Sequence, residues 1–378
     1  MSLAPRAVLV HRVTEYEGLL ARHGTHGQAE FFLSSRGRSI EDVRRRHERH
    51  RRGLAEVAAA VPLSWRQATV ERADLDRFLF GPEDVVVVVG QDGLVANAAK
   101  YLDGQPVVGI DTDPGRNPGV LVRHRAADAG TLLRSAAASA ERTGVDELTM
   151  AEAVTDDAQR LLALNEIYLG PPSHQTARYT LAVDGGTDGK GPAGAPGAGS
   201  VAGSAGTVAG SAGTVAGSAG TVAGSAGTAA GSMGTAAGSV AGSMGTAGSA
   251  ARAAGWADSA GRAGSAPEPQ ASSGVLVGTG TGATGWLRSL WLERSSPLTL
   301  PAPTTRRLAW FVREAWPSPT TGTTRVEGVL NAGNALHLSV ESDRLVVFGD
   351  GMESDALELT WGQTVRVGVA DTALRLVG

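Results

Sequence analysis

Residues Gly81 to Leu102 read GPEDVVVVVGQDGLVANAAKYL and carry the clearest fold signal in the sequence. Its five consecutive valines, Val85 to Val89, predict a buried strand, because an unbroken apolar run is typical of a parallel strand covered on both faces. The turn Gly90-Gln91-Asp92-Gly93 follows, and Leu94 to Leu102 predicts a short helix of small residues. Gln105 to Ile110 then predicts a second strand. Strand, helix and strand in this order form a βαβ unit, so we expect an N-terminal α/β domain.

The segments around this unit fit the same domain, which we place at residues 1–145. Ala7 to His11 predicts a strand, Ser39 to Ala60 predicts a helix with Ser39 as its N-cap, and Thr131 to Thr143 predicts another helix. Within the long helix, the run RRRHERHRR from Arg44 to Arg52 is able to bind a polyanion. Such a run is more often a solvated helix face, and we interpret it so.

Beyond residue 145 the pattern changes to one of strands. Asp146 to Leu164 fits either a pair of strands or a strand and a helix. From Tyr179 onward, short segments alternate apolar and polar residues and are separated by Gly, Asp and Asn turns. They predict a β-rich, sandwich-like domain at residues 146–378. These segments read YTLAVDG, GVLVGTG, ALHLSV, DRLVVFGDG, ALELTW and TVRVGV.

A low-complexity block at about 186–270 interrupts this second domain. Its unit GSAGTVA begins at Gly203, Gly210 and Gly217 and then degenerates. Two glycines in seven residues oppose a helix, and side chains this small bury too little area to offset the ordering entropy. We therefore predict a disordered insertion at the tip of a β connection.

Composition narrows the possible compartments and partners. The formal net charge is −4, which favours neither nucleic acid nor an anionic membrane as a partner. The chain contains no cysteine, which excludes disulfides, thiolate metal sites and a cysteine nucleophile, and favours a reducing cytosol. No signal peptide and no membrane-length apolar run is evident. The sequence thus predicts a cytoplasmic protein.

The turn after the valine strand is the first candidate for chemistry. Its glycines allow a phosphate chain to approach the backbone, and N–H groups at the start of the following helix attract negative charge. An acid held there, Asp92, can accept a proton from an attacking hydroxyl or orient a metal ion. Taken alone, Asp-Gly is more often a simple turn.

Three stretches together resemble the NAD kinase family. DVVVVVGQDGLVANAAKYLDGQPVVGID resembles its strand–GGDG–helix segment, and LNEIYLG, from Leu164 to Gly170, resembles its Asn-Glu motif. SSGVLVGTGTGATGW, from Ser272 to Trp286, resembles its S-D-G…T-P-T-G-S-T-A-Y segment. RLVVFGDG, ending at Asp350-Gly351, resembles a late strand and turn of the same fold. The resemblance covers roughly Val85 to the C-terminus without the insertion.

The resemblance implies a two-domain architecture with a nucleotide site between an α/β and a β-rich domain, and a homo-oligomer. It also implies ATP-dependent phosphorylation of the 2′-hydroxyl of the adenosine ribose of NAD, giving NADP, with a divalent metal such as Mg²⁺. Asp92 would be the general base, and no protein residue is assigned as a metal ligand. The residues implied to bind the nucleotides are Gly90, Gly93, Asn97, Asn165, Glu166, Thr281, Gly282, Thr284 and Gly285.

The motifs also depart from the family pattern. The second glycine of GGDG is Gln91, the acid of S-D-G is Ser273, and A-Y is Gly285-Trp286. These departures leave two alternatives to an NAD kinase. One is a catalytically silent nucleotide-binding sensor of the same fold, and the other is a kinase that acts on another hydroxyl.

A second glycine pattern offers a competing motif. Gly280, Gly282 and Gly285 form G-x-G-x-x-G after an apolar strand and so imitate the dinucleotide fingerprint of a Rossmann unit. Such a unit requires an acid about twenty residues later, and the segment 295–305 contains none. We interpret the pattern as accidental.

Overall fold

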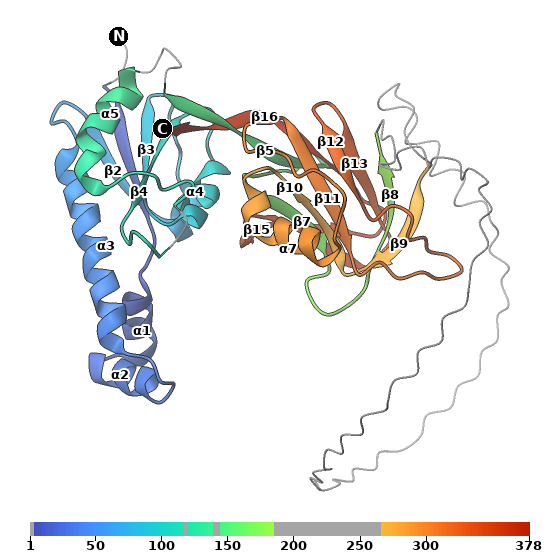
Figure 1. Ribbon diagram of the computed structural model, residues 1–378, viewed down its shortest axis with the longest axis horizontal. Helices are drawn as coiled ribbons and strands as arrows, with labels where there is room; N and C mark the ends of the chain where they lie inside the picture. The colour runs from blue at the N-terminus through green and yellow to red at the C-terminus, as the bar shows by residue number, and fades with distance from the viewer. Residues whose placement is uncertain (1–3, 117–118, 139–143, 185–265) are drawn as a thin grey trace, which may run out of the picture. The chain divides into compact units, whose positions relative to one another are not determined.

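The N-terminal region is an α/β layer built on parallel strands (Figure 1). The computed structural model describes residues 4–116, 119–138, 144–184 and 266–378. The strands pair in parallel in the order β2-β1-β3-β4; the sequence predicts β1, β3 and β4 as strands, whereas β2 was missed. They are β1 (Arg6–His11), β2 (Arg66–Glu71), β3 (Asp84–Gly90) and β4 (Pro106–Asp111).

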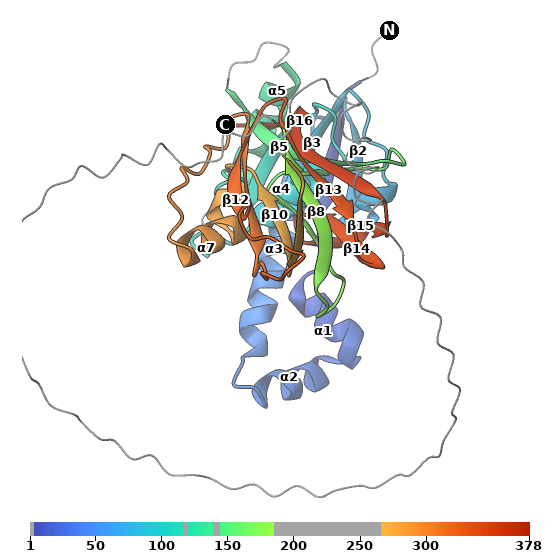
Figure 2. The ribbon, with the colours of Figure 1, turned by 90° about the vertical axis from the view of Figure 1, so that its right-hand side faces the viewer.

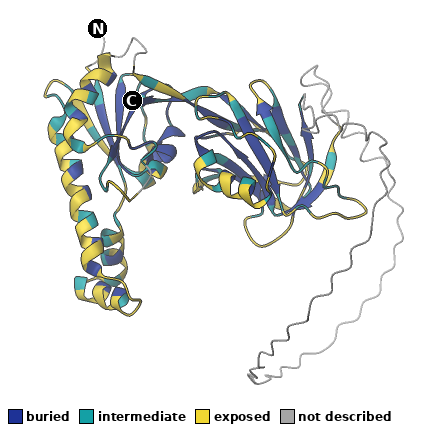
Figure 3. Ribbon diagram, viewed as in Figure 1, coloured by how far each residue is buried: buried dark blue, intermediate teal, exposed yellow. Residues whose placement is uncertain are grey.

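The five valines of β3 are buried because helices cover both faces of the sheet. Val85, Val87 and Val89 belong to a cluster with side chains of α3 (Ile40–Ala60) and α5 (Ala129–Ala138). Val86 and Val88 face the opposite way, into a cluster with α4 (Asp92–Ala99). Figure 3 shows these strands as buried. Burial of each valine stabilises the fold by roughly 1.5–3 kcal/mol.

Helix α4 begins at Asp92, two residues before the predicted start at Leu94, and ends at Ala99. The βαβ prediction is confirmed, and Asp92 becomes the first residue of the helix instead of part of a free turn. An acid in this first turn interacts favourably with the helix dipole, which accounts for the early start.

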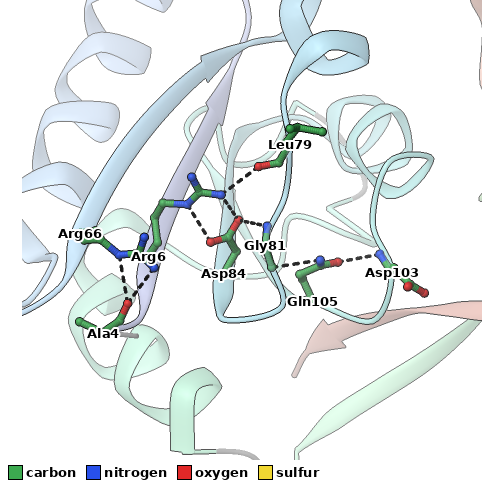
Figure 4. Close-up of polar contacts among 8 residues, drawn as sticks. All are labelled: Ala4, Arg6, Arg66, Leu79, Gly81, Asp84, Asp103 and Gln105. Atoms are coloured by element: carbon green, nitrogen blue, oxygen red, sulfur yellow. Dashed lines mark hydrogen bonds and ion pairs between the residues drawn. The ribbon is translucent and has the colours of Figure 1, made fainter. Parts of the chain in front are cut away.

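An ion pair fixes the amino ends of β1 and β3 (Figure 4). Arg6 Nε and Nη2 donate to the buried Asp84 carboxylate at 2.8 and 2.5 Å, and the Gly81 N–H donates to it at 2.7 Å. Gln105 Nε2 donates to the Gly81 carbonyl at 3.1 Å. A buried charge needs such partners, and they anchor β3 at the end opposite Asp92.

Two short helices, which the sequence analysis did not predict, pack on the start of α3. They are α1 (Glu15–His23) and α2 (His26–Ser34), and short 3-10 turns lie at η1 (Arg72–Arg77) and η2 (Ala126–Asp128). Ser39 is the N-cap of α3, although its side chain makes no capping hydrogen bond.

The basic run of α3 agrees with a solvated helix face. Arg44, Arg45, Arg46 and Arg49 form ion pairs with nearby acidic side chains. The exception is His50, which is buried against the body of the protein. Within the described residues, no helix is long and apolar enough to cross a membrane.

The C-terminal region contains antiparallel strands, and its last strand also joins the α/β sheet. β16 (Thr364–Val377) pairs in parallel with β4 and antiparallel with its other neighbours, so the first sheet has ten strands. The ambiguous segment 146–164 is a strand pair without a helix. The remaining strands of this sheet are β5 (Val145–Thr155), β6 (Arg160–Ala163), β8 (Ala177–Val183), β9 (Glu268–Ser272) and β13 (Ala335–Val340).

A second sheet of six strands is antiparallel throughout, in the order β12-β11-β10-β7-β14-β15. One apolar cluster lies between it and the antiparallel strands of the first sheet, as in a sandwich (Figure 2). α7 (Trp286–Glu293), after the turn η3 (Gly282–Thr284), covers the outer face. The strands are β7 (Glu166–Gly170), β10 (Gly274–Gly278), β11 (Arg307–Arg313), β12 (Glu327–Asn331), β14 (Arg344–Gly349) and β15 (Met352–Thr360).

The glycine pattern at 280–285 does not belong to a Rossmann unit. The strand that follows it, β11, is antiparallel to β10, whereas a Rossmann unit returns to a parallel strand. This agrees with the interpretation of the pattern as accidental.

Most of the predicted insertion at 186–270 lies outside the described residues. The described strands on either side, β8 and β9, are antiparallel neighbours paired from Ala177↔Ser272 to Leu181↔Glu268. β9 was missed because it is short and contains Pro269, which breaks the alternating pattern. A proline is tolerated there because β9 is an edge strand.

Candidate functional site

A pocket lies where β3 ends and α4 begins. Its volume is about 150 Å³, compared with roughly 300–1,000 Å³ for sites that enclose drug-sized ligands. All the described residues belong to one compact unit. The lining residues are Asp92, Val120, Leu121, Asn165, Glu166, Thr281, Gly282, Thr284, Gly285 and Trp286.

Most of the predicted site residues meet in this pocket. Asp92, the Asn165-Glu166 pair and the residues predicted between Thr281 and Gly285 all line it. Gly90, Gly93 and Asn97 are not among the lining residues. Sequence reasoning missed the wall at Val120 and Leu121, whose only signal was the turn-rich loop that follows β4.

Asp92 holds this missed wall through its carboxylate. Oδ1 accepts the N–H groups of Leu121 and Val122 at 2.8 and 2.9 Å, and Oδ2 accepts that of Val120 at 3.0 Å. A carboxylate offers about four acceptor positions, so three are occupied. The wall also runs close to β4, because a Cβ on Gly109 would lie 2.1 Å from the Leu121 carbonyl oxygen.

Asp350 holds the second wall of the pocket, the segment 164–166, through its carboxylate. Its carboxylate accepts the N–H groups of Leu164, Asn165 and Glu166 at 2.8, 2.7 and 3.3 Å. Its own N–H donates to the Glu166 carbonyl at 3.1 Å. Asp350 adopts a left-handed conformation, with φ of 54°, in the turn between β14 and β15. The resemblance placed Asp350 in the fold, and its role in holding the Asn-Glu segment comes from the structure.

The Glu166 carboxyl group differs from both aspartates. No described residue donates a hydrogen bond to it, and it lines the pocket. Burial, and to a smaller extent the negative charge of Asp350, raises the pKa of Glu166 to about 7. Burial also raises the pKa of Asp350 to about 6, against the opposing effect of its three N–H donors and of Lys100. A carboxyl group that titrates near neutral pH is suited to proton transfer.

The third wall is the turn after β10, which packs on the start of β7. Thr279 donates its N–H to the Asn165 carbonyl at 2.9 Å and its hydroxyl to the Leu164 carbonyl at 2.5 Å. Gly282 permits the contact, because a Cβ there would lie 2.2 Å from the Asn165 carbonyl oxygen. Thr281 lines the pocket, and its hydroxyl is buried without a hydrogen-bond partner among the described residues.

An aromatic side chain closes this wall. Trp286 stacks on Tyr168, with ring centroids 5.4 Å apart and planes inclined by 25°. The Arg313 guanidinium lies over the Trp286 ring, 5.4 Å from its centroid. Trp286 is therefore held in a fixed orientation at the edge of the pocket.

Polar contacts tie α4 to the turn that carries Asp350. Asn97 accepts from Arg72 Nε at 2.6 Å and donates to the Asp350 carbonyl at 3.0 Å, so both polar atoms of its side chain are bonded within the protein. Lys100 is buried and pairs with Asp355 at 2.6 Å. The predicted nucleotide-binding residue Asn97 thus connects the two aspartate-bearing elements.

The pocket contains two carboxylates, from Asp92 and Glu166. Among the described residues there is no group of three or more His, Asp or Glu side chains placed to hold a metal ion. Mg²⁺ in phosphoryl transfer is commonly bound by one or two carboxylates together with substrate phosphates. The donor set therefore fits a metal ion that arrives with a nucleotide.

No protein-family model matches the chain, and a search of curated proteins finds no significant match. The fold defines an α/β region joined to antiparallel β sheets, and the pocket defines a polar, acidic site with one aromatic wall. The function of the protein is therefore inferred from the chemistry of this pocket.

Proposed function

We propose that the protein is an NAD kinase-like phosphotransferase, which uses ATP and Mg²⁺ to phosphorylate the 2′-hydroxyl of the adenosine ribose of NAD. One observation carries the proposal. Three motifs that are far apart in the sequence, at Asp92, at Asn165-Glu166 and at Thr281–Trp286, line a single pocket. These are the segments on which the resemblance to the family depends.

The chemistry of the pocket favours a sugar hydroxyl as its occupant. Its lining includes two acids and neither lysine nor arginine, so the γ-phosphate of ATP would need Mg²⁺ to neutralise its charge at the mouth of the pocket. A hydroxyl, by contrast, can donate a hydrogen bond to a carboxylate. At about 150 Å³ the pocket suits one sugar or ring, with the γ-phosphate at its mouth and the other phosphates of NAD and ATP beyond it.

The test is direct. Purified protein is incubated with Mg²⁺, ATP and NAD, and NADP is measured with an NADP-specific dehydrogenase. We expect NADP from NAD and no phosphorylated product from the analogue that lacks the adenosine 2′-hydroxyl. Absence of NADP across pH 6–9 would contradict the proposal.

A silent nucleotide-binding protein is the second candidate, and one observation favours it. The Asp92 carboxylate, which the family resemblance makes the base, already accepts three backbone N–H groups. Binding of NAD at micromolar concentration, measured by calorimetry, together with no phosphoryl transfer to NAD, would favour this candidate.

A further inference from the structure

Two acids line the pocket, and their surroundings assign them different tasks. We propose that Glu166, and not Asp92, takes the proton from the hydroxyl that is phosphorylated, while Asp92 holds the pocket wall. The inference rests on the proposed function and identifies the group that performs its proton transfer. Three sets of contacts lead to it.

The first set concerns Asp92. Its oxygens are engaged by the N–H groups of Val120, Leu121 and Val122, and the last two residues are buried. A hydroxyl proton would have to compete with these donors for the carboxylate. Moving the carboxylate toward a substrate would leave buried N–H groups without partners and release the wall that Val120 and Leu121 form. Asp92 is therefore placed to shape the pocket.

The second set concerns Glu166. Its backbone is fixed on both sides, by Asp350 at its N–H and carbonyl and by Gly278, its partner on β10. The start of its side chain is therefore fixed, and its carboxyl group lies at the pocket with no donor from the described residues. A group that makes no hydrogen bond with the described residues is available to a ligand.

The third set concerns Thr281. Thr281 lines the same pocket as Glu166, and its hydroxyl is buried with no hydrogen-bond partner among the described residues. A buried hydroxyl without a partner is costly unless a ligand or water supplies one. A substrate hydroxyl can donate to Glu166 and accept from Thr281 at the same time. A phosphate oxygen or a carbonyl can only accept, so the pair selects a hydroxyl.

In the proposed reaction, the substrate O–H bond breaks as its oxygen forms a bond to the γ-phosphorus of ATP, and the proton moves to the Glu166 carboxylate. The bond between the γ-phosphorus and the β–γ bridging oxygen breaks, and ADP leaves. Glu166 returns its proton to water after the product departs.

The charges around Glu166 favour a pKa close to neutral pH. Asp350 faces it from the β14–β15 turn, and Asp92 lines the same pocket from the start of α4. Lys100, the residue that follows α4, is paired with Asp355, and its positive charge opposes the rise in the pKa of Asp350. Burial is the larger effect, and together with Asp350 it brings the pKa of Glu166 to about 7.

The test compares Glu166→Gln with Asp92→Asn in the NADP assay over pH 5.5–9. For Glu166→Gln we expect kcat to fall by about 10²-fold or more, with the Kd for NAD changed by less than about fivefold. The acidic limb of the pH profile, with a midpoint near 7, should disappear. Asp92→Asn should raise KM and lower the melting temperature, and it should keep the acidic limb.

Two further variants guard against a folding defect. Glu166→Asp retains a carboxylate and should retain the acidic limb at reduced kcat, whereas Thr281→Val should raise KM while keeping that limb. Wild-type turnover and an unchanged pH profile in Glu166→Gln would overturn the assignment while leaving the proposed function intact. Loss of the acidic limb in Asp92→Asn would return the role to Asp92. Absence of NADP formation by the wild type would overturn both the assignment and the proposed function.

Discussion

Asp92 and Asp350 each use one carboxylate to satisfy three consecutive backbone N–H groups, and each thereby fixes one wall of the pocket. The second of these walls holds the backbone of Glu166, whose carboxyl group receives no hydrogen bond from the described residues. The two aspartates therefore shape the site, whereas the Glu166 carboxyl group remains available to a ligand. Hydrogen bonds to a carboxylate favour its charged form, and burial without them favours the neutral form.

The environment of Glu166 predicts a cost in stability. Its pKa rises from an ordinary value of 4.5 to about 7, so between these pH values the folded state holds the proton more tightly than the unfolded chain. Stability therefore falls as pH rises through this window. Glu166→Gln should unfold with a free energy higher by on the order of 1–3 kcal/mol at pH 8, and show little difference at pH 4.5. Urea denaturation at both pH values measures this, and equal stabilities at pH 8 would show that Glu166 is well solvated.

At the scale of elements, the turn between β14 and β15 is the part that positions the start of β7. Asp350 sits in this turn, and α4 supports it through Asn97 and Lys100. The start of β7 also receives the turn after β10, through Thr279. Two elements therefore converge on residues 164–166, which explains how the end of a strand can hold a pocket residue in place.

Asp350→Asn tests this arrangement. Asparagine offers one acceptor oxygen, and its amide group turns N–H donors toward the backbone N–H groups of residues 164–166. At least one buried donor loses its partner, and we expect a loss of about 1–3 kcal/mol in the free energy of unfolding at pH 8. Weaker NAD binding should accompany it. The control is Asp343→Asn, on the exposed turn before β14, which should change neither quantity. Equal stabilities of the two variants would show that Asp350 does not hold the segment.

Elements with a local signal were predicted well from the sequence. The valine strand, α3 and the βαβ order depend on apolar runs and capping residues that lie within one segment. The β9 strand was missed because Pro269 interrupts its pattern, and α1 and α2 were passed over. The pocket walls were harder, because a backbone N–H leaves no signature in the sequence. Asp92 was recognised as a site residue from its turn, whereas its partners at Val120 to Val122 follow a separate loop.

At the scale of the whole molecule, β16 joins the two regions of the chain. It is 14 residues long and pairs with β4 in the α/β region and with β5 and β13 in the antiparallel part. Residues near the C-terminus therefore complete the sheet that begins with β1. The second sheet carries Glu166 on β7 and packs on the antiparallel part of this sheet through one apolar cluster, and this packing keeps Asp92 and Glu166 in one site.

The same sheet predicts the effect of removing the repeats. β8 and β9 are antiparallel neighbours, and their last described pair is Leu181↔Glu268. Deleting Thr187 to Arg262 leaves ten residues between Leu181 and Glu268, enough to connect two neighbouring antiparallel strands. Replacing a connection of 86 residues by one of ten lowers the cost of loop closure by roughly 2 kcal/mol.

We therefore expect the deletion variant to fold and to melt at the same temperature as the full chain or higher, with the Kd for NAD unchanged. Calorimetry and NAD titration measure the two quantities. The matched control removes Asp184 to Pro267, which leaves only Ala182 and Val183 between Leu181 and Glu268; it should lower the melting temperature, because both residues would lose their pairing with β13 to form the turn. If the first deletion lowers the melting temperature by many degrees, the repeats contribute to the stability of the folded body. A weakened affinity for NAD at unchanged melting temperature would instead assign the repeats a part in binding.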